Sequence, residues 1–98
     1  MAGHVWVKQG VCGPAARQIR RAIGVLAELY GTYNDDLFIT SICDSTHAAG
    51  SLHYDGNALD FKRRNVHIKA IREVLGADFD VIEYTDVRDI FHVEYDPK

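Results

Sequence analysis

Apolar residues recur at helical spacing in two stretches of the chain. The first runs from Gly13 to Gly31, with Pro14 suited to the first helical turn and Gly31 to the position after the last one. The second follows Asn65, a suitable N-cap, and ends at Gly76. The apolar residues that share one face are Ile19, Ala22, Ile23, Leu26 and Tyr30 in the first stretch and Ile68, Ile71, Val74 and Leu75 in the second. The pattern therefore predicts two amphipathic helices.

Shorter runs rich in β-branched and aromatic residues predict strands around these helices. The predicted strands are His4–Gln9, Leu37–Cys43, Ala58–Lys62, Asp80–Tyr84 and Ile90–Tyr95. The segment Asp44–Asn57 has no periodicity and is predicted to be a long loop, of a length that is usually functional. The order of elements predicts an α+β fold, a two-layer sandwich in which a small, mainly antiparallel sheet carries two helices on one face.

Composition narrows the classes of function. The chain has 98 residues, of which 47% are hydrophobic, so we expect a single folded domain over residues 1–98. A net charge of -3 argues against a nucleic-acid partner.

No apolar run approaches the ~20 residues of a membrane span and no signal peptide is evident, so we expect a cytoplasmic protein without a membrane partner. We also expect a monomer. Cys12 and Cys43 are interpreted as buried thiols, with a single disulfide as the alternative.

Strand alternation brings two chemically active side chains to one side of the predicted sheet. The apolar residues that share a face are Leu59 and Phe61 in one strand and Phe91, Val93 and Tyr95 in another. If both apolar faces cover the helices, Asp60 and His92 project from the same open side. His53 lies in the loop that leads to Asp60, and Gly56 permits a sharp return of the chain over that side.

Two imidazoles, one carboxylate and a position left for water make up a catalytic zinc site. Such a metal acidifies its bound water and polarises a carbonyl group. Taken singly, each of these residues also has a simpler interpretation. His53 could be a loop residue, Asp60 a hydrogen-bond acceptor at a strand end, and His92 a satisfied strand histidine.

The segment from Ser51 to Asp60 reads S-x-H-x-x-G-x-A-x-D, and a strand histidine follows in IFHVEY. This pattern resembles the zinc D-Ala-D-Ala peptidase superfamily, which also contains the hedgehog signalling domain. The run SLHYDGNALDF is especially similar to the hedgehog version of the motif. The resemblance covers Leu37 to Tyr95 and includes the order of the elements. It implies a fold of this type and a zinc ion ligated by His53, Asp60 and His92.

The resemblance also implies positions for the groups that move protons. The cell-wall peptidases of this superfamily carry a glutamate three residues before the last ligand, where this chain has Asp89. Hedgehog-like members carry one six residues before it, where this chain has Asp86. Asp89 is the first choice for the general base, Asp86 the second, and Glu83 a more distant candidate. His47 matches a non-ligand active-site histidine that could steady an oxyanion or orient the water, although it could equally be an exposed loop residue.

The substrate-binding groups match the pattern of the family less completely than the zinc ligands do. Carboxypeptidase members are expected to hold the substrate carboxylate with an arginine before the S-x-H motif, but LFITSICDSTHAAG contains none. This departure favours an endopeptidase, unless Arg88, or Arg63 and Arg64, substitutes. Ser51 and Tyr54 could contact the substrate from the loop.

The resemblance thus implies a zinc-dependent peptidase, a hydrolase that cleaves a peptide bond in peptidoglycan stem peptides. It would be a bacterial or bacteriophage cell-wall enzyme of carboxypeptidase or endopeptidase type, such as an endolysin released to the wall by lysis. The alternative is a zinc-containing binding module of hedgehog type that has kept the ligands and lost catalysis.

Overall fold

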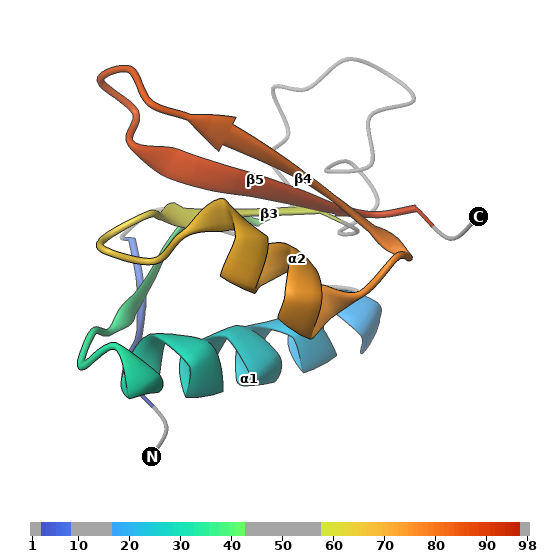
Figure 1. The fold of residues 1–98 in the computed structure, drawn as a ribbon, viewed down its shortest axis with the longest axis horizontal. Coiled ribbons are helices and arrows are strands. Elements are labelled where there is room, and N and C mark those ends of the chain that lie inside the picture. Colours follow the sequence, from blue (N-terminus) through green and yellow to red (C-terminus); the bar gives the residue numbers. More distant parts are fainter. Residues whose placement is uncertain (1–2, 9–16, 43–57, 97–98) are drawn as a thin grey trace.

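The computed structural model describes residues 3–8, 17–42 and 58–96. These residues form two helices and five strands in the order β1 (Val5–Val7), α1 (Arg17–Thr32), β2 (Leu37–Ile42), β3 (Ala58–Lys62), α2 (Ile68–Leu75), β4 (Phe79–Tyr84) and β5 (Ile90–Tyr95). Both helices lie on the same side of the sheet, which gives two layers (Figure 1). The α+β prediction is confirmed at this level.

The sheet is mixed, with the strand order β1-β2-β3-β5-β4. β1 runs parallel to β2, and the other neighbouring pairs are antiparallel. β3 therefore lies between β2 and β5 in the middle of the sheet, although a long stretch of sequence separates it from β5. This arrangement places the predicted ligand strands side by side.

The helices differ from the sequence expectation at their ends. α1 ends at Thr32 rather than before Gly31, and the left-handed residue that follows is Asn34, with φ of 59°; asparagine tolerates this conformation. The N-cap of α2 is His67 rather than Asn65, and its Nδ1 accepts a hydrogen bond from the Lys69 backbone N–H at 3.1 Å. Val66 is 4% exposed, so the chain between Asn65 and the helix packs into the core before the helix begins.

The core lies between the helices and one face of the sheet. Its largest fully buried side chains are Tyr30, Phe61, Phe91, Ile19, Leu26, Leu37, Ile39, Leu59, Ile71 and Val93. Burying each such aliphatic or aromatic side chain contributes roughly 1.5–3 kcal/mol. Tyr30 packs edge-on against Phe61, with ring centroids 5.9 Å apart, and its hydroxyl donates to the carbonyl of Lys62 at 2.7 Å. This contact fixes the end of β3 against α1.

The other side of the sheet, here called the outer face, carries polar side chains such as Asp60, His92 and Glu94 together with apolar ones such as Phe38, Ile82 and Ile90. Because side chains alternate along each strand, the residues between the core positions of β2, β3 and β5 point away from the helices. Among the described residues, no helix is long and apolar enough to cross a membrane.

Candidate metal centre

Asp60 and His92 meet on the outer face of the sheet. β3 and β5 pair antiparallel, and the register sets Asp60 directly opposite His92. The Asp60 Oδ1 lies 2.6 Å from the His92 Nδ1, and the two side chains are 17% and 11% exposed. The prediction that alternation brings these two residues to one side is confirmed. Each apolar neighbour on its strand faces the helices, so neither side chain can turn away without exposing core residues.

Glu94 extends this pair into a row of three groups, called here the His92 cluster. It follows His92 by two residues in β5, so both side chains point to the same face. Its Oε1 lies 2.7 Å from the His92 Nε2, which leaves the imidazole between two carboxylates. Alternation along Ile90–Tyr95 puts Glu94 on the face of His92, but the motif assigns it no role. Its position two residues after a candidate ligand was the available signal.

The two carboxylates determine the charge state of the imidazole. Burial by itself lowers the pKa of His92, but the hydrogen bonds to Asp60 and Glu94 outweigh that effect, and the net result is a raised pKa. If Glu94 accepts the Nε2 proton, the Nδ1 lone pair faces a carboxylate oxygen of Asp60. Two lone pairs at 2.6 Å require a proton between them. A zinc ion lies about 2.0–2.2 Å from each ligand atom, so it could take the place of this proton only if the two atoms moved apart to more than about 3 Å.

The two candidate ligands that the structure describes, Asp60 and His92, are of types that bind zinc. Carboxylate oxygen and imidazole nitrogen are both zinc ligands, and a carboxylate on the second ring nitrogen is the usual support for a ligating histidine. Within residues 3–8, 17–42 and 58–96, no group of three or more side chains converges as a metal cluster. Glu94 does not complete one, because it contacts the ring nitrogen that points away from Asp60.

Several predicted residues lie outside the described part of the chain, and their roles stay predictions. They are the third ligand His53, the auxiliary His47, the substrate candidates Ser51 and Tyr54, and the cysteines Cys12 and Cys43.

The strand next to Asp60, β2, is paired irregularly with β3. The β2–β3 register shifts between Ile39 and Ser41, and Ser41 is the residue paired with Asp60. Such irregularities are frequent beside functional sites because they redirect side chains.

Asp89, the first candidate for the general base, belongs to a second charged group, called here the Arg63 cluster. Arg63 donates from Nε to Asp89 at 2.7 Å and from its terminal nitrogen to Glu83 at 2.8 Å. Glu83 is paired with Phe91 in the β4–β5 register, so it lies on the side of the sheet that faces the helices. Asp89 has φ of 50° in the turn before β5. Both carboxylates therefore contact an arginine, and no contact joins either of them to the His92 cluster within the described residues.

Asp86, the second candidate, is bound to Arg88 within the same turn. The Arg88 guanidinium donates to both carboxylate oxygens of Asp86, with the shortest contact at 2.6 Å. This hydrogen bonding lowers the pKa of Asp86 to about 2. Arg88 also stacks on the ring of Tyr84, with its guanidinium carbon 3.8 Å from the ring centroid. Asp86 thus already neutralises the charge of Arg88, which makes Arg88 less available for its predicted contact with substrate.

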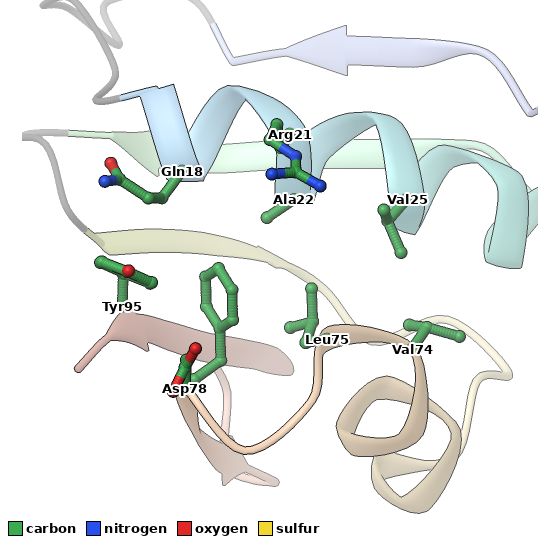
Figure 2. Close-up of a pocket in the computed structure, with 9 residues that line it drawn as sticks. Gln18, Arg21, Ala22, Val25, Val74, Leu75, Asp78 and Tyr95 are labelled. Carbon is green, nitrogen blue, oxygen red and sulfur yellow. The ribbon is translucent and has the colours of Figure 1, made fainter. Parts of the chain in front are cut away.

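The described residues form hollows on both sides of the sheet. One of about 260 Å³ lies between the helices and the sheet end, bordered by Gln18, Arg21 and Val25 of α1, Leu75 of α2 and Tyr95 of β5 (Figure 2). It is separated from the His92 cluster by the sheet. Another, of about 500 Å³, lies on the outer face and includes Asp60 in its wall. Of these two hollows in the described part of the chain, the second is the one placed to hold a ligand beside the candidate metal centre.

These features define a small α+β domain with an imidazole held between carboxylates on the outer face of its sheet. No known protein family, no curated protein and no solved structure matches the chain. The functional argument therefore depends on the motif and on the geometry of these residues.

Proposed function

We propose that this protein is a zinc metallopeptidase with the fold of the hedgehog and D-Ala-D-Ala peptidase superfamily, acting on peptidoglycan stem peptides. The observation that carries the proposal is the 2.6 Å contact between Asp60 and His92 on the outer face. These are the two described residues of the three that the S-x-H-x-x-G-x-A-x-D motif and the downstream histidine assign as ligands. They lie 32 residues apart in the sequence, and the pairing of β3 with β5 brings them together.

The chain's own residues have separate tasks in this proposal. Asp60 and His92, together with His53, would hold the metal. Bound zinc would supply an acidified water and polarise the scissile carbonyl. Glu94, at 2.7 Å, can accept the Nε2 proton of His92, and loss of the proton between Nδ1 and Asp60 would then leave the Nδ1 lone pair for the metal. The hydrogen bond to Glu94 also holds the ring plane, so that a ligand nitrogen is in place before metal binds.

A proton acceptor completes the proposal. Asp89 remains preferred over Asp86, because a carboxyl group with a pKa near 2 is a weak base at neutral pH. Asp89 would have to leave Arg63 to reach the water, and Arg63 would then keep Glu83 as its partner. His47 could assist by steadying the oxyanion.

A second function, a zinc-containing binding module without catalysis, is favoured by one specific observation. Both aspartates in the positions of the family's catalytic glutamates are engaged by arginines, Asp89 by Arg63 and Asp86 by Arg88. Ion pairs of this kind stabilise a turn and do not by themselves serve a reaction. The ligand set suits either function, so the two are separated by activity and not by zinc content.

The test combines zinc content with hydrolysis. Purified protein reconstituted with zinc is compared with Asp60→Asn and His92→Gln, and with His4→Gln as a control that alters an exposed histidine away from the site. Cleavage of diacetyl-L-Lys-D-Ala-D-Ala and of purified stem peptides is followed by mass spectrometry. We expect one zinc per chain and cleavage in the wild type and in His4→Gln, with both lost in the site variants. Zinc without cleavage would support the binding module, and absence of zinc would refute both functions.

A further inference from the structure

The outer-face hollow beside Asp60 has a charge opposite to that of the whole chain. Its wall includes Lys8 from the segment after β1, Lys62 from the end of β3, and Arg88 from the β4–β5 turn, with Asp60 as the one carboxylate among its lining residues. The chain as a whole carries a net charge of -3. A concave site with locally reversed charge concentrates anions. Because Asp60 is one of the proposed metal ligands, the cations lie next to the place of reaction.

The three cations are not equivalent. Arg88 is bound through two nitrogens to Asp86 and stacked on Tyr84, so its guanidinium is already used. Lys62 donates one hydrogen bond to the Arg88 carbonyl at 3.0 Å, which holds its ammonium at the hollow and, as far as residues 3–8, 17–42 and 58–96 show, leaves two of its three N–H groups for a ligand. The two lysines are therefore better placed to bind an anion than the arginine that the sequence suggested.

Lys8 is fixed at its backbone and available at its side chain. Its N–H donates to the carbonyl of Ile39 at 2.8 Å, which continues the β1–β2 pairing and holds the residue beside β2. Its side chain is exposed, and among the described residues its ammonium has no hydrogen bond or ion pair. Thr40 and Ser41 add hydroxyl groups to the same wall. An acid group in the hollow would thus meet two ammonium groups and hydroxyl donors.

We propose that this hollow, the basic hollow, binds the free α-carboxylate of the residue on the C-terminal side of the scissile bond, through Lys8 and Lys62. This inference rests on the proposed function for its link to a scissile bond. A volume of about 500 Å³ accommodates a small terminal residue such as alanine with its carboxylate. The two lysines would replace the arginine that is missing before the S-x-H motif, and the enzyme would act as a carboxypeptidase.

The test measures binding in zinc-free protein, so that hydrolysis of the peptide does not affect the titration. ¹⁵N-labelled protein treated with chelator is titrated with diacetyl-L-Lys-D-Ala-D-Ala and, separately, with its C-terminal amide. The variants are Lys8→Gln, Lys62→Gln and the double substitution, with Lys8→Arg as a charge-retaining variant. Lys69→Gln on α2 is the matched control, because Lys69 is an exposed lysine in the other layer. The amide spectrum of each variant confirms that it is folded.

We expect the acid to bind more tightly than the amide and to shift the signals of Thr40, Asp60 and Lys62. Each glutamine variant should weaken binding of the acid roughly two- to fivefold, as expected for exposed charge pairs, and the double variant should remove the preference. Lys8→Arg and Lys69→Gln should bind like the wild type, and 0.5 M salt should reduce the preference.

Other outcomes overturn the inference. Equal affinity for acid and amide, shifts confined to another region, or no binding of either peptide would each refute the basic hollow as a carboxylate site. The outcome for the peptidase is separate. Acid-selective binding without cleavage after zinc is restored would keep the basic hollow and refute the peptidase, whereas cleavage of both peptides at equal rates would keep the peptidase and refute the basic hollow.

Discussion

Two clusters in this protein place a basic side chain between two carboxylates. In the His92 cluster the imidazole lies between Asp60 and Glu94, with contacts of 2.6 and 2.7 Å. In the Arg63 cluster the guanidinium lies between Asp89 and Glu83, with contacts of 2.7 and 2.8 Å. The distances are nearly the same, and both clusters tie β3, or the residue after it, to the β4–β5 hairpin. The chemistry available to each is nevertheless different.

The difference lies in whether the central side chain, Arg63 or His92, can lose its proton. Hydrogen bonds that Arg63 donates to Glu83 and Asp89 raise its pKa above its already high value, so it stays protonated and its nitrogens act only as donors. It is a permanent connection between strands. His92 can give up the proton between its Nδ1 and Asp60, and both atoms could then ligate a metal ion after moving apart. The same arrangement of charges therefore yields a structural clamp in one place and a candidate metal centre in the other.

The largest expected effect concerns Asp89, the residue of the Arg63 cluster to which we also assign a catalytic task. Asp89→Asn and Glu83→Gln each remove one carboxylate charge from Arg63, so they form a matched pair. If Asp89 accepts the proton, its substitution should reduce kcat by about 10²- to 10⁴-fold at unchanged zinc content, while Glu83→Gln should leave kcat within a few-fold of the wild type. The measurement is steady-state hydrolysis of diacetyl-L-Lys-D-Ala-D-Ala together with zinc analysis. Equal and small losses in both variants would assign Asp89 a purely structural role.

Most of the fold was predictable because its elements are short and strictly patterned. The bounds Ala58–Lys62 and Ile90–Tyr95 agree with the structure, since alternation of apolar and polar residues defines both the strand and its two faces. The same alternation predicted that Asp60 and His92 share a side. Helix ends were less predictable, because His67 caps α2 through a contact that depends on how Val66 enters the core.

Contacts made across turns were not predictable from the pattern. Arg63 contacts Asp89 and Glu83 in a region where Arg64 and Asp89 both have positive φ, 53° and 50°, and nothing in the local sequence required these conformations. Lys8 reaches the wall that contains Asp60 because β1 pairs in parallel with β2, which brings the N-terminal residues beside a strand some 30 positions later. The arginine missing from one segment could thus be replaced by lysines from others, which only the topology reveals.

A smaller effect is expected on stability, measured by urea unfolding of zinc-free protein. His92→Gln removes the charge between two partly buried carboxylates and should cost about 2 kcal/mol, because Asp60 and Glu94 then repel each other with little solvent to screen them. Arg63→Gln should cost less, since its cluster is more exposed.

Addition of zinc sharpens this comparison. At a free concentration of 100 times Kd it should stabilise the wild type and Arg63→Gln by about 2.7 kcal/mol and leave His92→Gln unchanged. If His92→Gln gained as much as the wild type, the metal would bind elsewhere and the contrast between the two clusters would be lost.

The smallest effect is expected at the Asp86–Arg88 pair, a third carboxylate–arginine contact whose side chains are about half exposed. Its guanidinium is the main cause that lowers the pKa of Asp86 from 3.8 to about 2. Because the folded-state pKa is depressed, the pair's stabilising contribution is complete above pH 3.8 and disappears only as the pH falls through about 2. In Arg88→Gln, the midpoint of the Asp86 carboxyl carbon in a ¹³C NMR titration should rise part of the way toward 3.8, since the residue 88 backbone N–H still donates to Asp86. An unchanged midpoint would mean that the turn's backbone, and not the guanidinium, keeps the carboxyl ionised, and the Arg88 guanidinium in the wall of the basic hollow would then be available to a ligand.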